Sequence, residues 1–304
     1  MNNVVLSEEL SQISRLFLYA SMAIYTFAFL ADALNLASRA SQNKDARARA
    51  TVTEKAGLFF LIFATVLLAI GVVLRAISVA RVPWGNMYEY AITGTLTIAV
   101  IFLIARIFVK EIQFVSLLIS GFALLTLGAA TTLFYVEVAS LMPALQNYWL
   151  IIHVSVAVLA TAFFNIAAAL SVAYLLKTAG WVQKSKLAFV KGMNRLFGSF
   201  PADNKLERLS YRFNIIGFIL WTFTLIAGAI WAERAWHRYW GWDTKEVWTF
   251  IIWTLYAGYL HANATRGWSG KRSAWLSLVG FAAVIFNFVV VNLYFKGLHV
   301  YSGL

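Results

Sequence analysis

Cysteine is absent from the 304 residues of the chain, and charged residues make up only 12% of them. Without cysteine the chain has no structural disulfide, no thiolate metal site and no dithiol redox centre of its own. The low charged fraction, together with 61% hydrophobic residues, lies outside the range of soluble proteins and indicates an integral membrane protein. The net charge of +12 therefore reports membrane orientation and does not indicate a nucleic-acid partner.

Long apolar segments are abundant. A helix needs about 20 residues to cross a hydrocarbon core of roughly 30 Å. Eight segments reach or approach this length, near residues 14–36, 56–78, 88–109, 113–134, 149–176, 213–232, 247–262 and 274–295, and the seventh is short. The polar start of the chain favours a membrane span over a cleaved signal peptide for the first segment. We expect an all-α polytopic membrane bundle of about eight transmembrane helices, forming one membrane domain over residues 1–304.

Basic residues are distributed unequally between the two sides of this bundle. All but seven of the 25 Lys and Arg residues fall on one side, which the positive-inside rule makes cytoplasmic. The seven on the other side are Arg15, Arg75, Arg81, Arg234, Arg238, Lys245 and Lys296. This orientation places both termini outside, together with a tryptophan-rich run over residues 231–248.

The only long cytoplasmic loop, residues 177–212, is basic and carries apolar residues at helical spacing. These are Leu187, Val190, Met193, Leu196, Phe197 and Phe200. Two interpretations stay open for this loop, an amphipathic helix on the anionic inner leaflet and a solvated linker with a few apolar anchors.

The tryptophan-rich run reads WAERAWHRYWGWDTKEVW and holds Trp231, Trp236, Trp240, Trp242 and Trp248. An ordinary membrane-interface belt needs one or two such rings per span. This density, interrupted by charged residues, is typical of a platform for a large flat aromatic ligand that bears carboxylates. Arg238 and Lys245 are candidates to meet those carboxylates, and equally to pair with Asp243 or Glu246.

The chain has four histidines. His153, His237 and His299 fall toward the outer side, whereas His261 falls toward the inner end of the seventh span. Imidazole is the usual protein ligand of haem iron, and His153 and His299 are the natural pair to approach it from opposite faces. The alternative for any one of them is an ordinary hydrogen-bonded side chain. An imidazole within the bilayer, as at His261, is a functional hypothesis by default.

Four separated motifs occur in a defined order. They are PWGNMYE from Pro83, WLIIH from Trp149, WGWDTKE from Trp240 and GLH from Gly297. Together with the Tyr259–His261 stretch, they resemble the CcsA/ResC family of cytochrome c assembly proteins, which belongs to the WWD-domain haem-handling superfamily. The resemblance extends from about residue 80 to the end of the chain.

The resemblance implies the system II route of cytochrome c maturation. With a ResB/CcsB-type membrane partner, the family moves haem across the membrane and presents it on the outer face. It promotes thioether attachment to the Cys-X-X-Cys-His motif of an apocytochrome c. The chain would then be a subunit of a holocytochrome c synthase complex, with haem b as its bound substrate.

Site residues follow from the resemblance by position. His153 and His299 would be the outer axial ligands of the haem iron, and His261 would ligate iron in an intramembrane site that the partner completes. The residues expected to cradle the haem are Trp236, Arg238, Trp240, Trp242, Asp243 and Trp248. The family has Gly where this chain has His237, and Pro where it has Thr244, so His237 is a spare imidazole beside the expected site.

Two other classes of function stay open. A bis-His b-type haem electron-transfer protein would place paired histidines at matched depths in the bilayer, and only His261 is clearly intramembrane. A small-molecule transporter would show internal repeats with discontinuous helices, and none is visible in the sequence. For the location, we expect a bacterial plasma membrane in preference to a thylakoid membrane.

Overall fold

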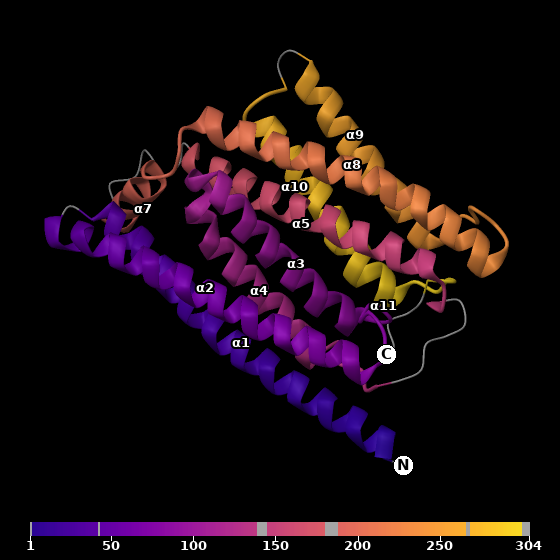
Figure 1. Cartoon of the computed structure of the whole chain (residues 1–304). Coiled ribbons are helices and arrows are strands. Elements are labelled where there is room, and N and C mark those ends of the chain that lie inside the picture. Colours follow the sequence, from indigo (N-terminus) through magenta and orange to yellow (C-terminus); the bar gives the residue numbers. More distant parts are fainter. Residues whose placement is uncertain (1, 42, 139–144, 180–187, 266–267, 300–304) are drawn as a thin grey trace.

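A computed structural model of the chain describes residues 2–41, 43–138, 145–179, 188–265 and 268–299 (Figure 1). Every regular element in these ranges is helical. In chain order they are α1 (Asn2–Ala40), α2 (Lys44–Ser78), α3 (Met87–Phe108), η1 (Lys110–Val115), α4 (Ser116–Thr132), α5 (Tyr148–Lys177), α7 (Ala188–Gly198), α8 (Asp203–Trp236), α9 (Thr244–Ala264), α10 (Lys271–Phe286), the π-helix η3 (Asn287–Val291) and α11 (Asn292–Tyr294).

Seven helical segments of the described chain are long and apolar enough to cross a membrane. They are α1, α2, α3, η1 with α4, α5, α8, and α10 continuing through η3 and α11. The expected all-α polytopic membrane bundle is confirmed. The seventh expected span, near residues 247–262, is the helix α9, which is not among the seven candidate spans. It packs against α8 and α10 and so belongs to the same bundle.

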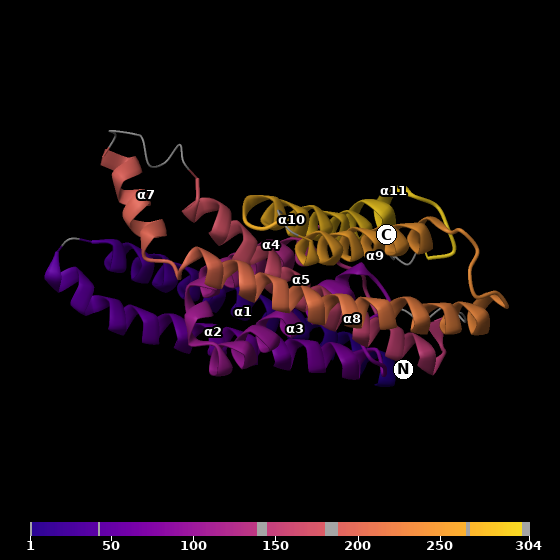
Figure 2. The same ribbon diagram turned by 90° about the horizontal axis from the view of Figure 1, so that it is seen from above.

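The two largest hydrophobic cores of the described residues share α5 and α8. The larger core joins α1, α2, α3 and α4 to one face of α5 and to the start of α8. The smaller core lies between α5, α8, α9 and α10. Figure 2 shows α9, α10 and α11 stacked over α8, with α1, α2 and α3 on the opposite side of the bundle. The helices α3, α5, α8, α9 and α10 therefore surround the middle of the molecule.

Side-chain caps fix where three of these central helices begin. The Asn86 Oδ1 atom accepts from the Glu89 N–H at 2.9 Å at the start of α3, and Asn147 Oδ1 accepts from the Trp149 N–H at 2.9 Å at the start of α5. Asp243 and Glu246 form a reciprocal capping box at the start of α9. Such caps satisfy backbone N–H groups that have no partner inside the helix. They hold the tryptophan-rich run and the PWGN loop at one end of the bundle.

The start of α1, the end of α8 and α11 all lie at this same end, whereas α7 lies at the other (Figure 1). The end with the tryptophan-rich run is the one that the sequence predicts to face outside. Helix α7 occupies part of the expected cytoplasmic loop, and its Met193, Leu196 and Phe197 pack with Leu176 and Phe200. Leu187, Lys184, Lys186 and Arg266 lie outside the described residues. Contact between α7 and a membrane surface stays a prediction.

Candidate functional site

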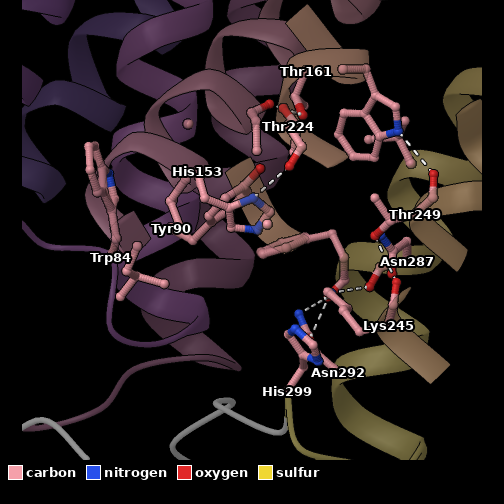
Figure 3. Close-up of a pocket in the computed structure, with 18 of the residues that line it drawn as sticks. Trp84, Tyr90, His153, Thr161, Thr224, Lys245, Thr249, Asn287, Asn292 and His299 are labelled. Carbon is pink, nitrogen blue, oxygen red and sulfur yellow. Dashed lines mark hydrogen bonds between the residues drawn. The ribbon is translucent and has the colours of Figure 1, made fainter. Parts of the chain in front are cut away.

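A cavity of about 230 Å³ lies between α3, α5, α8, α9 and the segment from α10 to α11 (Figure 3). Most of its described lining is aliphatic or aromatic, as is usual for a site that binds an organic ligand. The polar side chains that line it include His153, Thr161, Thr224, Lys245, Glu246, Thr249, Asn287, Asn292 and His299. The cavity therefore combines an apolar body with polar groups at separate points of its wall.

His153 reaches the cavity from the second turn of α5. Its Nδ1 atom lies 3.0 Å from the carbonyl oxygen of Thr224 on α8. Gly228, one turn further along α8, lies directly under the ring, because a Cβ atom there would come within 2.8 Å of His153 Cε1. The close approach of the two helices thus depends on a residue without a side chain at this position.

His299 reaches the same cavity from the segment after α11. Its Nδ1 atom lies 2.7 Å from Oδ2 of Asp243, and the backbone N–H of Leu298 donates to Oδ1 of Asp243 at 3.0 Å. Gly297 lies against this carboxylate, since a Cβ atom there would overlap Oδ1. The hydrogen bond from His299 is the main cause that lowers the pKa of Asp243 below its usual value. Asp243 thus caps α9 and also fastens the C-terminal segment over the cavity.

Both imidazoles are held through the same ring atom. A carbonyl oxygen and a carboxylate accept hydrogen bonds but cannot donate them, so each Nδ1 carries the proton in the neutral ring. The Nε2 atoms of His153 and His299 are then the unprotonated atoms that can bind a metal. Partners of this kind fix the tautomer and the orientation of metal-binding histidines.

Trp231 connects the two histidines. Its ring stacks on His153 with centroids 5.9 Å apart and planes 11° apart, and it meets His299 edge to face at 5.4 Å. Trp236 closes the group, with its ring centroid 4.8 Å from both Trp231 and His299. Trp231 is almost completely buried. The start of the tryptophan-rich run is therefore a rigid support behind the histidine pair.

The PWGN loop forms the opposite wall. Trp84 lines the cavity across from Lys245 in Figure 3, and the loop is held by the buried carboxylate of Glu89. That carboxylate accepts from Arg75 at 3.0 Å, from Arg81 at 2.6 Å and from the Gly85 N–H at 2.8 Å. Charge-assisted bonds of this kind are stronger than neutral ones. Glu89 fixes the position of the loop from the first turn of α3.

The expected cradle residues fall in different places. Trp240 lines the cavity, and Trp236 packs on His299. Trp242 is 76% exposed, and its ring contacts that of Trp240 edge to face, with centroids 5.9 Å apart. Trp248 turns away from the cavity and packs on Phe286 of α10 at 4.3 Å. The tryptophans of the run thus have separate roles: Trp236 supports His299, Trp240 lines the cavity, and Trp242 is exposed. They do not form one continuous binding surface.

The remaining sequence candidates separate in the same way. The guanidinium of Arg238 lies against the backbone of Gly241, and Arg238 does not line the cavity. His237 is exposed and ends α8. His261 is exposed in the last turn of α9, apart from the cavity lining. Among the described residues the structure brings together one histidine pair, His153 with His299.

Sequence reasoning missed several lining residues. Asn287 and Asn292 are polar residues within an otherwise apolar span, which is a signal for function in a membrane helix. Trp84 lay inside a recognised motif without an assigned role. Three atoms of lining residues, Trp84 Nε1, Glu246 Oε1 and Asn287 Oδ1, are buried without a hydrogen-bond partner in the described structure. Because buried polar groups normally have partners, these atoms are positions at which a bound ligand or a water molecule can form a hydrogen bond.

Comparisons with known proteins agree with this architecture. A family model described as "Cytochrome C assembly protein" matches residues 84–299. A protein named cytochrome c biogenesis protein CcsA from Prochlorococcus marinus is 36% identical over 260 residues, which cover 79% of this chain and 81% of the relative. A protein of the same name from Guillardia theta is 35% identical over 249 residues, which cover 76% and 80%.

Among solved structures, cytochrome c haem lyase CcmF is similar with a TM-score of 0.60. The match has 16% sequence identity and covers 92% of this chain but 46% of that one. At this identity the likeness shows the fold alone, and this chain spans about half the length of that neighbour. The family model, in contrast, covers most of the chain and both cavity histidines. The chain belongs to the cytochrome c assembly protein family.

Proposed function

We propose that this chain binds haem b as a substrate in the cavity and presents it for covalent attachment to an apocytochrome c. As a member of its family the chain is a multi-pass membrane protein with a role in cytochrome c maturation. One observation carries the finer proposal. His153 and His299 line the same cavity, and the contact of each Nδ1 atom with an acceptor gives the ring the tautomer whose Nε2 atom can ligate iron.

Formation of the thioether bonds requires mainly that the haem vinyl groups and the cysteine thiols are held in position. Each thioether forms when a cysteine S–H adds across a vinyl group, so that sulfur bonds to one carbon, hydrogen to the other, and no electrons are exchanged overall. A protein that holds the vinyl edge in a fixed orientation promotes this addition through proximity. The support of Trp231 and Trp236 behind the two histidines and the wall of Trp84 opposite suit that role. The apocytochrome supplies both thiols, and its own histidine then replaces one iron ligand.

A ResB/CcsB-type partner subunit completes the proposed complex. His261 lies exposed on α9, where a neighbouring membrane protein can reach it, and it would ligate haem in an inner site together with a residue of that partner. Haem would enter at this inner site and leave at the outer one. The side of the membrane remains a prediction from the charge distribution. The bacterial plasma membrane as location also remains an expectation, which the charge distribution does not address.

The test uses the chain co-expressed with a ResB-type subunit and an apocytochrome c reporter. His153→Ala and His299→Ala should each abolish holocytochrome formation, and each purified complex should lose the absorption spectrum of a bis-histidine haem. Added imidazole should restore part of the yield, because a free ligand can occupy the vacated position. His237→Ala is the matched control, since this exposed residue lies in the same region but not in the cavity.

Three outcomes would contradict the proposal. Normal holocytochrome levels in both cavity variants would remove the histidine pair from the mechanism. Haem that cycles reversibly between oxidation states but is never transferred would favour the electron-transfer alternative. A parent complex that carries no haem under any loading condition would favour transport of another small molecule.

A further inference from the structure

Lys245 has an unusual environment for a lysine. It lies in the first turn of α9, and its side chain runs into the cavity. The ammonium donates to the carbonyl oxygen of Asn287 at 2.7 Å and to Oδ1 of Asn292 at 2.9 Å (Figure 3). Of the described residues that line the cavity, it is the only lysine or arginine.

Both of these partners are uncharged. In the described structure no carboxylate oxygen lies within 4.0 Å of the Lys245 ammonium. The carboxylate of Asp243 is committed to His299, to the Leu298 N–H and to the start of α9. One oxygen of Glu246 accepts from the Gly241 and Asp243 N–H groups. A buried charge is stable when it is paired, and none of the described residues offers the Lys245 ammonium a carboxylate at ion-pair distance.

The helix opposite is built to hold the ammonium in place. Residues Asn287–Val291 form a π-helical segment between α10 and α11. Such segments shift the backbone hydrogen-bond pattern and are frequent at functional sites. Here the segment offers the Asn287 carbonyl oxygen to Lys245, while Asn292 follows on the next turn. Lysine has three N–H donors, and these contacts use two, so one donor remains for a ligand.

The sequence left Arg238 and Lys245 as equal candidates for the carboxylates of the ligand, and the structure separates them. The Arg238 guanidinium packs on Gly241 outside the cavity lining, whereas the Lys245 ammonium lies within it. We propose that Lys245 is the residue that recognises an ionised carboxylate of the cavity ligand, which for haem is one propionate. This inference rests on the proposed function, because it takes haem as the ligand.

The experiment compares two probes on the purified complex with its partner subunit, haem b and haem b dimethyl ester, in which both propionates are neutral. The parent should bind haem more tightly than the ester. Lys245→Gln keeps hydrogen-bond donors for Asn287 and Asn292 but removes the charge. It should weaken haem binding by roughly 10- to 100-fold and leave ester binding unchanged, the range expected for loss of one charge-assisted bond.

Two variants are the controls. Lys296→Gln removes a positive charge from an exposed residue at the same end of the molecule and should leave both affinities at parental values. Lys245→Arg keeps the charge and should retain a preference for haem over the ester. If Lys245→Gln weakens binding of both probes equally because the cavity is damaged, the preference retained by Lys245→Arg decides for the proposal, and its loss decides against.

The outcomes also separate this inference from the proposed function. A parent complex that binds both probes equally, or a Lys245→Gln variant that keeps the full preference for haem, overturns the role of Lys245 and leaves haem binding intact. A parent complex that binds neither probe overturns the proposed function, and it also overturns the proposal that Lys245 recognises a propionate.

Discussion

His237 and Trp242 have left-handed backbone conformations, with φ of 57° and 60°. A residue with a Cβ atom is strained there, whereas glycine is not. At His237 the reason is the end of α8, because its N–H bonds to the Glu233 carbonyl oxygen at 2.8 Å as a helix C-cap. Glycine is the usual residue at such a cap. The glycine expected from the resemblance at this position therefore has a backbone explanation, and the imidazole of His237 is not needed for the cap.

His237→Gly should therefore be tolerated. Relief of the left-handed strain, about 1–2 kcal/mol, exceeds the entropic cost of glycine, about 0.5–1 kcal/mol, so we expect unchanged or slightly raised stability. Holocytochrome yield should stay at the parental level. The measurements are thermal unfolding of the purified protein and cytochrome c yield. Arg234→Gly, within the last turns of the same helix, is the control and should destabilise by about 1 kcal/mol. A His237→Gly variant without haem would make His237 a ligand.

Asp243 decides which nitrogen of His299 carries the proton. In Asp243→Asn the side-chain N–H can face Nδ1, which favours the tautomer with its proton on Nε2 and blocks that atom for iron. We expect haem affinity and holocytochrome yield to fall by about 10- to 100-fold, the usual effect of losing such a partner. Glu233→Gln, which removes a carboxylate from a surface ion pair with Arg234, is the control and should have no effect. Parental haem binding by Asp243→Asn would show that the tautomer does not matter.

The ionisation of Asp243 should also make haem binding depend on pH. The pKa of Asp243 is lowered from 3.8, chiefly by His299, so its ionised form stabilises the folded arrangement. This contribution is fully present above about pH 4 and is lost as the pH falls through the lowered value. Acid release of haem should therefore be steeper in the parent than in Asp243→Asn below pH 4.

At the scale of elements, the end of α2 and the start of α3 are joined by a buried ion cluster. The side chains of Arg75 and Glu89 are 1% and 0% exposed, and Arg81 adds a second guanidinium to the same carboxylate. Arg75 also donates to the Ser11 hydroxyl and the Val136 carbonyl oxygen. The cluster thus links α1, α2 and α3 to the loop that carries Trp84. These contacts give the glutamate of the PWGNMYE motif, Glu89, a structural role.

Glu89→Gln should destabilise the protein by about 3–5 kcal/mol, because two arginines lose their counter-charge in a site closed to water. The loop with Trp84 should loosen, which would lower holocytochrome yield even in the folded fraction. Thermal unfolding and limited proteolysis around residues 81–86 measure the two effects. Glu111→Gln breaks an exposed pair with Lys205 and should leave the unfolding temperature near that of the parent. Parental stability of Glu89→Gln would contradict the described role.

At the scale of the whole molecule, the positions of the helices in the chain could be predicted from the sequence, whereas the rotation of each helix about its axis could not. Hydropathy over about 20 residues is a strong local signal, so the spans could be located. The rotation of α9 about its axis is set by packing with α8 and α10, and only this rotation turns Trp248 toward Phe286 and Lys245 into the cavity. The pairing of His153 with His299 was anticipated from motifs, whereas the Asn287 and Asn292 contacts required the fold.

The helix α9 also sets a distance between the two proposed haem sites. Lys245 and His261 lie at its opposite ends, and at a rise of about 1.5 Å per residue they are about 24 Å apart along the axis. The cavity lining includes no residue of α9 beyond Thr249. In the described chain, then, His261 has no direct connection to the histidine pair. In the proposed complex, a transfer route between the two sites would run along the surface of α9 and the proposed partner subunit.

His261→Ala should therefore interrupt supply and leave the outer site intact. We expect the complex purified with its partner to contain less haem and to yield less cytochrome c than the parent. Haem added to the purified complex should still load the His153 and His299 site with the parental spectrum, because α9 keeps its packing when an exposed side chain is shortened. His237→Ala, another exposed histidine, should show neither defect. If His261→Ala instead carries and delivers haem like the parent, His261 has no part in supply, and a route through an inner site loses its only support in this chain.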